Sequence, residues 1–114
     1  MSEALIVLTN LPDPESAERL ASELVARRLA ACVNILAPCR SVYRWKGEVE
    51  SAQEVPLLIK CPRSRYTELE CAIRKAHPYE LPEIVAVPVE RGLPEYLGWI
   101  AEQCTDGAPD APCS

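Results

Sequence analysis

Residues 41–61 read SVYRWKGEVESAQEVPLLIKC and place a Lys46-Gly47 turn between two apolar segments. Glycine accepts the positive φ angles that tight hairpin turns need. The segment before the turn extends back to residue 31 and is interrupted at Ala37-Pro38-Cys39, which indicates a bulge or bend in a strand. The segment after the turn, 48–61, ends in an apolar run. The sequence therefore predicts a long two-stranded hairpin.

Further strand and helix patterns flank this hairpin. A short apolar run at 4–9 predicts a strand, and apolar residues recurring every three or four positions predict a helix that starts near Pro14. A second helix is expected over 63–76, a strand over 82–89 and a last helix over 95–104. This order is the split βαβ arrangement, so we predict an α+β, ferredoxin-like sandwich with an additional C-terminal helix.

In such a sandwich the helices cover one face of the sheet. The other face presents apolar strand residues to water, and burial against copies of the same chain removes that cost. We expect one domain over 1–104 that forms an oligomer. A polar segment over 105–114, with little to bury, is expected to be a mobile tail.

The charge balance and the short apolar segments exclude several kinds of partner. The 114 residues carry a net charge of −5 at pH 7 and contain no basic run, so neither nucleic acid nor an anionic membrane surface is an expected partner. No apolar segment approaches the roughly 20 residues of a membrane span. The N-terminus shows no secretory signal, and we therefore expect a cytoplasmic protein.

Six cysteines are many for this length, but none of them forms a zinc-knuckle or thioredoxin-type pair. An even number allows a disulfide framework. A reducing cytoplasm and the apolar surroundings of most of these positions favour small buried hydrophobic residues instead. Cys113, in the predicted tail, is expected to be exposed.

The sequence holds no motif that is typical of catalysis. It has no glycine-rich phosphate loop, no nucleophile elbow and no second histidine to activate a thiol or hydroxyl. Acidic pairs such as Glu48 and Glu50 are expected to be solvated carboxylates rather than a general acid and base. We therefore expect a protein that is not an enzyme.

Residues 77–83 read HPYELPE and lie between a predicted helix and a predicted strand. Two prolines stiffen this segment, which concentrates an imidazole, a phenol and two carboxylates. A loop so constrained and so polar suits binding. The structural alternative is that His77 favours the negative end of the preceding helix and that the prolines end that helix.

Several blocks of the chain, in order, resemble the CutA family of divalent-cation tolerance proteins. They are AACVN (30–34), SVYRWKG (41–47), LLIK (57–60), HPYELPE (77–83) and PEYLGW (94–99). The resemblance extends from Ala4 to about residue 101. It implies a ferredoxin-like homotrimer, held together through its long hairpin strands, with a role in tolerance to copper and other divalent metals.

The resemblance also implies a metal site. Some members of the family are thought to bind copper through a cysteine on the first strand and two adjacent histidines before the Pro-Tyr pair. In this sequence Thr9 and Ala76 stand at two of those positions and only His77 remains. We predict a site for copper or another divalent cation at His77, with Glu80 and Glu83 as carboxylates that bind the metal or orient the imidazole.

The same blocks allow two other interpretations. Aromatic side chains with one lysine suit a small anionic or zwitterionic ligand in a cleft between subunits, and the candidate residues are Tyr43, Trp45, Lys60, Tyr79 and Trp99. This is analogous to the trimeric PII signalling proteins, which bind effectors between subunits. The third interpretation is a stable trimeric scaffold, stiffened by eleven prolines, that interacts with other proteins.

Overall fold

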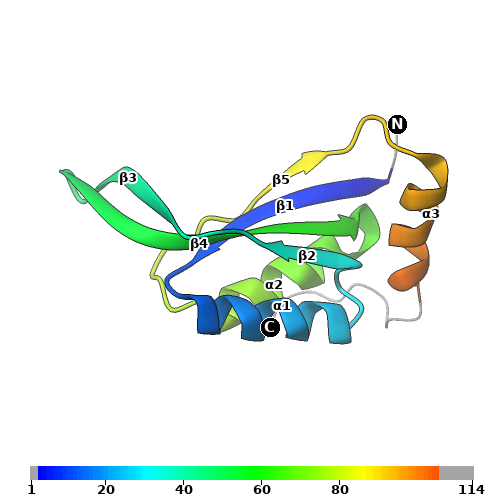
Figure 1. The fold of residues 1–114 in the computed structure, drawn as a ribbon, viewed down its shortest axis with the longest axis horizontal. Coiled ribbons are helices and arrows are strands. Elements are labelled where there is room, and N and C mark those ends of the chain that lie inside the picture. Colours follow the sequence, from blue (N-terminus) through cyan, green and yellow to red (C-terminus); the bar gives the residue numbers. More distant parts are fainter. Residues whose placement is uncertain (1–2, 106–114) are drawn as a thin grey trace.

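An antiparallel five-stranded sheet carries two helices on one face (Figure 1). The computed structural model describes residues 3–105, with strands β1 (Ala4–Leu11), β2 (Cys32–Ile35), β3 (Cys39–Trp45), β4 (Glu48–Pro62) and β5 (Val85–Pro88). The helices are α1 (Pro14–Ala26), α2 (Tyr66–Ala76) and α3 (Pro94–Gln103), and a 3₁₀ turn, Arg63–Arg65, precedes α2. The predicted order of elements and the α+β ferredoxin-like fold are confirmed.

The long strand β4 joins the sheet to the hairpin. The strands lie in the order β2-β4-β1-β5, and β3 pairs with the first half of β4. Strands β2 and β3 are thus the two halves of the predicted interrupted strand. Lys46 and Gly47 have φ angles of 50° and 85°, as the tight turn requires. The predicted hairpin is confirmed, and it projects from the body of the sheet (Figure 1).

Alternation along β1 and β4 decides which side chains form the core. Every second residue of β1 is fully or almost fully buried, whereas those between are half-buried. The core joins this face to the apolar faces of α1 and α2, and its fully buried members include Val7, Leu11, Leu24, Leu29, Leu57, Ile59, Leu69 and Ile73. Burial of each such side chain contributes about 1.5–3 kcal/mol to the stability of the fold. Because these side chains share one face of the sheet, α1 and α2 both pack on that face.

Two local signals place the helices and the segment that follows them. The Asp13 carboxylate accepts a hydrogen bond from the Ser16 N–H at 2.8 Å, which caps α1 and lowers the pKa of Asp13. Helix α2 ends at Ala76, because His77 precedes a proline and takes an extended conformation, with ψ 133°. The chain then runs from the end of α2 toward the hairpin and β5.

The opposite face of the sheet has no helix over it in the described part of the chain (Figure 1). Val85 and Val87 of β5 are 49% and 48% exposed, so the predicted open apolar face is present. Helix α3 packs through Ile100 against Ala4 and Ala31, at the end of the sheet far from the hairpin (Figure 1). Within residues 3–105 no helix is long and apolar enough to cross a membrane.

The cysteines follow the prediction in part. Three of them are buried, as expected: Cys61, Cys71 and Cys104. Burial raises the pKa of Cys61 to about 12. Cys39 is exposed, contrary to the expectation for an apolar segment, because it starts the strand that leaves the body of the sheet. Cys71 is disulfide-bonded, and for this cysteine the prediction of a small buried hydrophobic residue in place of a disulfide partner is wrong. Cys113 and the predicted tail after Thr105 lie outside the described residues.

Candidate functional site

A pocket of about 980 Å³ opens between the β3–β4 hairpin and the segment 77–85. Its walls come from the end of β1, from both hairpin strands and from the segment after α2. Of the residues predicted from the sequence, five line this pocket: Tyr43, Trp45, Tyr79, Glu80 and Glu83. The volume is at the upper end of the range for small-molecule sites. We call this cavity the hairpin pocket.

The register of the hairpin explains which of its side chains meet there. Tyr43 pairs with Glu50, and Ser41 pairs with Ala52. Residues directly opposite each other in an antiparallel pair point to the same face of the sheet. All four of these residues line the hairpin pocket. Alternate positions on two strands therefore supply one wall of the cavity.

Asn10 connects this wall to the segment after α2. Its Nδ2 donates hydrogen bonds to Glu83 Oε1 at 3.1 Å and to Glu54 Oε1 at 3.4 Å. Glu54 is buried, with only 8% of its surface exposed. Neither Asn10 nor Glu54 is predicted as a site residue from the sequence. The predicted first strand ends at Thr9, whereas β1 continues to Leu11 and carries Asn10 to the edge of the pocket.

Tyr79 completes this polar group. Burial of its ring raises the pKa of Tyr79 to about 12, and the hydrogen bond to Glu54 adds to the shift. The phenol therefore stays protonated at neutral pH and donates to the buried carboxylate. Tyr79 is both an aromatic wall of the pocket and a fixed hydrogen-bond donor.

His77 lies behind the hairpin pocket and is not among the residues that line it. The side chain is 8% exposed, and its ring lies 4.6 Å from the Tyr79 ring. Its Nδ1 accepts a hydrogen bond from the Tyr79 N–H at 3.2 Å, while Nε2 donates to the carbonyl oxygen of Asn10. Both ring nitrogens are thus engaged, with the proton on Nε2.

These contacts bear on the predicted copper site. A metal at His77 would have to replace one of its two hydrogen bonds. Within residues 3–105, no group of three or more His, Cys, Asp or Glu side chains is arranged to hold a metal ion. Copper prefers several imidazole or thiolate ligands. The described residues of one chain therefore do not fit a copper ion.

Lys60 and Trp99 lie away from the hairpin pocket. Lys60 Nζ donates to Asn34 Oδ1 at 3.0 Å and lies 5.8 Å from the centre of the Tyr96 ring. The Tyr96 ring stacks on Trp99 at 5.4 Å. We call this group, Asn34, Lys60, Tyr96 and Trp99, the α3 patch. The residues predicted for one ligand cleft are thus divided between two places in a single chain.

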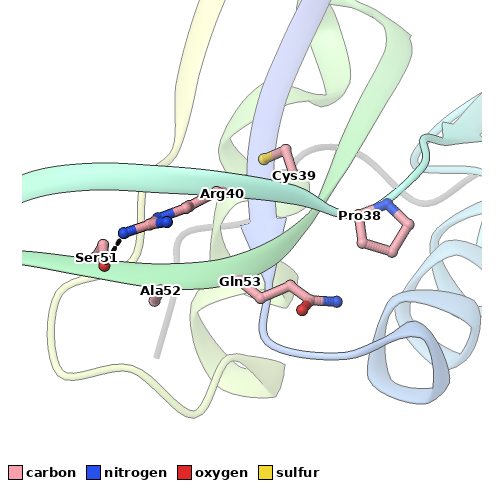
Figure 2. Close-up of a pocket in the computed structure, with 6 residues that line it drawn as sticks. All are labelled: Pro38, Cys39, Arg40, Ser51, Ala52 and Gln53. Carbon is pink, nitrogen blue, oxygen red and sulfur yellow. Dashed lines mark hydrogen bonds between the residues drawn. The ribbon is translucent and has the colours of Figure 1, made fainter.

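A smaller pocket, of about 470 Å³, lies where the hairpin leaves the sheet and is lined by Pro38, Cys39, Arg40, Ser51, Ala52 and Gln53 (Figure 2). Arg40 reaches across the two strands to Ser51, with 3.4 Å between Nη2 and Oγ (Figure 2). The nucleophile of this pocket is the Cys39 thiol, and its described polar neighbour is the Ser41 hydroxyl, at 3.8 Å. A hydroxyl does not activate a thiol as a base does, so this pocket shows no catalytic pairing.

Together, the sheet with one helical layer and the aromatic, acidic pocket beside its hairpin define a ferredoxin-like protein with a small-molecule-sized cavity. The model of the family described as CutA1 divalent ion tolerance protein matches residues 5–103, and the chain belongs to this family. The resemblance that the sequence blocks indicated is therefore confirmed.

Individual relatives support the assignment to this family. The chain is 45% identical over 97 residues to the divalent-cation tolerance protein CutA of Thermus thermophilus, which covers 85% of this chain and 94% of that protein. It is similar to the crystal structure of CutA from Xylella fastidiosa, with a TM-score of 0.88, 43% identity and coverage of 90% of this chain and 99% of the other. It also matches a protein from Nostoc sp. PCC 7120 described as PII-like protein CutA in apo form, with a TM-score of 0.82, 43% identity and coverage of 88% and 96%.

Proposed function

We propose that this chain is a non-enzymatic binding protein of divalent-cation tolerance and that the hairpin pocket binds its ligand. The observation that carries the proposal is a cavity of about 980 Å³ in which the rings of Tyr43 and Trp45 adjoin the hydrogen-bonded group of Asn10, Glu54 and Tyr79. Aromatic rings supply apolar area, and fixed polar groups orient a small molecule. The description of the Nostoc relative as PII-like supports a signalling role that depends on a small ligand.

The two tryptophans of the chain form a matched pair for a test, because Trp45 lines the hairpin pocket and Trp99 belongs to the α3 patch. Thermal unfolding is measured with panels of small cations, anions and zwitterions. At least one class should raise the Tm, since a ligand that binds only the folded state stabilises it. Trp45→Ala should abolish this increase, and Trp99→Ala should preserve it.

The opposite pattern contradicts the proposal. An increase that survives Trp45→Ala and disappears with Trp99→Ala would move the site to the α3 patch. If no class of ligand raised the Tm, the scaffold interpretation would replace ligand binding.

We also propose that the chain works as a homotrimer. Support comes from the projecting hairpin, on which Val42 and Val49 are 67% and 66% exposed (Figure 1). Burial of these side chains against other copies would remove apolar surface from water. Native mass spectrometry should find three chains of 12.6 kDa. Val42→Glu combined with Val49→Glu should lower the mass, and a monomeric wild-type protein would contradict the proposal.

Copper binding is the second candidate function, supported by the description of the family as divalent ion tolerance proteins. Because the described residues of one chain supply too few ligands, the metal would be shared between subunits, with His77, Glu80 or Glu83 of each contributing. Calorimetric titration with Cu(II) in a Cys39→Ser background, which removes the thiol that is exposed within residues 3–105, should then give a stoichiometry set by the trimer. His77→Gln should abolish binding. Equal binding without His77 would exclude a site at this imidazole.

We propose the cytoplasm as the compartment in which the protein acts. Support comes from four free cysteines among the described residues, the exposed Cys39 included, since thiols are kept reduced there, and the disulfide-bonded Cys71 is the exception to this pattern. Cell fractionation with compartment markers tests the proposal, and recovery with the periplasmic fraction would contradict it.

A further inference from the structure

The hairpin pocket is strongly acidic. The lining residues that are charged at neutral pH are one arginine, Arg44, and four glutamates, Glu50, Glu54, Glu80 and Glu83. A concave surface of one sign attracts ligands of the opposite sign and repels those of its own. We infer that this pocket takes a cationic organic ligand, an amine or a quaternary ammonium. The inference rests on the proposed function, and it replaces the expected anionic or zwitterionic ligand, which depended on Lys60.

An ammonium group of the protein itself already uses part of this lining. Lys46, at the tip of the hairpin, places Nζ 5.5 Å from the centre of the Trp45 ring. The same Nζ lies 3.8 Å from Glu80 Oε1. An ammonium over an aromatic face and beside a carboxylate is the arrangement that cation–π recognition uses. Both partners of this ion pair are largely exposed, so Lys46 is held weakly and a ligand can displace it.

The buried carboxylate of Glu54 gives a second reason. Its described partners are the Asn10 amide at 3.4 Å and the Tyr79 hydroxyl, and neither carries a positive charge. A carboxylate removed from water is costly without a compensating cation. An organic cation above Tyr79 and Glu54 would supply that compensation. The charge of the pocket is therefore stabilised when a cation binds.

Size and surface favour an organic cation over a bare metal ion. The cavity, at about 980 Å³, is far larger than an ion, and Tyr43, Trp45 and Tyr79 give it aromatic walls. Such walls bind the alkyl groups of an ammonium, whereas a metal ion needs several converging ligand atoms. The described residues provide no group of three metal-binding side chains.

A pair of isosteric probes tests the charge requirement. Choline and 3,3-dimethylbutan-1-ol have nearly the same shape, but only choline is charged. In the Trp99→Phe protein, Trp45 is the remaining tryptophan and reports on the pocket by fluorescence. Choline should change this fluorescence along a saturable binding curve. It should bind at least about tenfold more tightly than the uncharged alcohol. Acetate, as a small anion, should have no effect.

Three variants in the same background test the residues. Glu80→Gln removes an exposed carboxylate and should weaken choline binding by about fivefold. Lys46→Gln removes the competing ammonium and should strengthen binding by about threefold. Lys75→Gln is the control for Lys46→Gln, because it removes the same positive charge at an exposed position near the end of α2, outside the pocket lining. It should leave the affinity for choline unchanged.

Each other outcome overturns the inference in a distinct way. If the alcohol or acetate binds at Trp45 as tightly as choline, the hairpin pocket remains the ligand site but its ligand is not cationic. If Mg²⁺ or Cu²⁺ gives the same signal and displaces choline at lower concentration, the site is one for metal ions. If no probe affects Trp45, both this inference and the proposed function fail.

Discussion

The hairpin pocket and the α3 patch both combine aromatic rings with charged side chains, but the charges have opposite signs. The pocket places Tyr43, Trp45 and Tyr79 among carboxylates, whereas the α3 patch places the Lys60 ammonium over Tyr96. Strand β4 contributes to both, through Glu54 and Lys60. At roughly 3.3 Å per residue these two lie about 20 Å apart along the strand. One long strand therefore supplies two surfaces that suit different ligands.

The two regions also differ in how firmly they are held. The pocket wall is tied to β1 through Asn10, which binds Glu54, Glu83 and His77. The described hydrogen bonds of the α3 patch are those that Lys60 and, at 4.0 Å, the Cys32 thiol donate to Asn34 Oδ1 near the surface. Substitutions behind the pocket should therefore destabilise the protein more than substitutions in the patch.

His77→Ala should give the largest change in stability. It removes the hydrogen bonds to the Asn10 carbonyl and from the Tyr79 N–H, both at a buried position. We expect the free energy of unfolding to fall by about 2–3 kcal/mol. Urea denaturation measures this change. His77→Gln, which keeps a donor within reach of Asn10, should recover part of the loss, and a fall below about 0.5 kcal/mol would mean that His77 does not anchor the pocket.

Thr9→Val should stabilise the protein by about 1 kcal/mol. Thr9 is 1% exposed on the core face of β1, and its hydroxyl has no hydrogen-bond partner among the described residues. Valine keeps the shape and removes the polar group that water no longer solvates. Thr9→Ser, which keeps the hydroxyl and loses a buried methyl, should destabilise instead. Thr9 and Asn10 point to opposite faces of the sheet, so Thr9→Val should leave ligand binding in the hairpin pocket unchanged. An increase in stability with Thr9→Ser would contradict this account.

Much of this fold is predictable from local pattern. The Lys46-Gly47 turn, the interruption before Cys39 and the end of α2 before Pro78 all appear where the sequence indicates them. The boundaries differ by a few residues, since β1 gains Leu11 through its pairing with Val55. That pairing joins residues distant in sequence, and no local pattern contains it.

The site was predictable only in part for the same reason. Aromatic and acidic residues in distinctive blocks identified Tyr43, Trp45 and Tyr79, which do lie together. Lys60 stands in an equally distinctive block, but its place on β4 takes it to the other end of the sheet. Glu54 belongs to no such block, and its importance comes from contact with Asn10 across the sheet. Whether a charged residue joins a site depends on the register, which long-range pairing sets.

Alkaline pH should distinguish the pocket tyrosine from others. The pKa of Tyr79 is about 12 in the folded protein, above its ordinary value of 10.0. Between pH 10 and 12 the unfolded chain loses this proton while the folded protein keeps it, so the free energy of unfolding falls as pH rises through this window. Tyr79→Phe should make that fall shallower. Tyr66→Phe is the matched control, because Tyr66 has a similar pKa of about 12 outside the pocket, and it should reduce the fall without affecting choline binding.

The smallest effect on stability is expected for Lys60→Met in the α3 patch. This substitution removes the contacts of Nζ with Asn34 and the Tyr96 ring, near the surface, and should cost about 0.5 kcal/mol. If each chain forms its pocket alone, choline affinity should not change, since Lys60 lies outside the lining. A change in affinity, absent from the control Lys75→Met, would instead show that the patch of one subunit reaches the pocket of another. Native mass spectrometry of the same protein connects that result to assembly, because such an effect requires the homotrimer and should disappear when Val49→Glu, at an exposed hairpin position outside the pocket lining, separates the subunits.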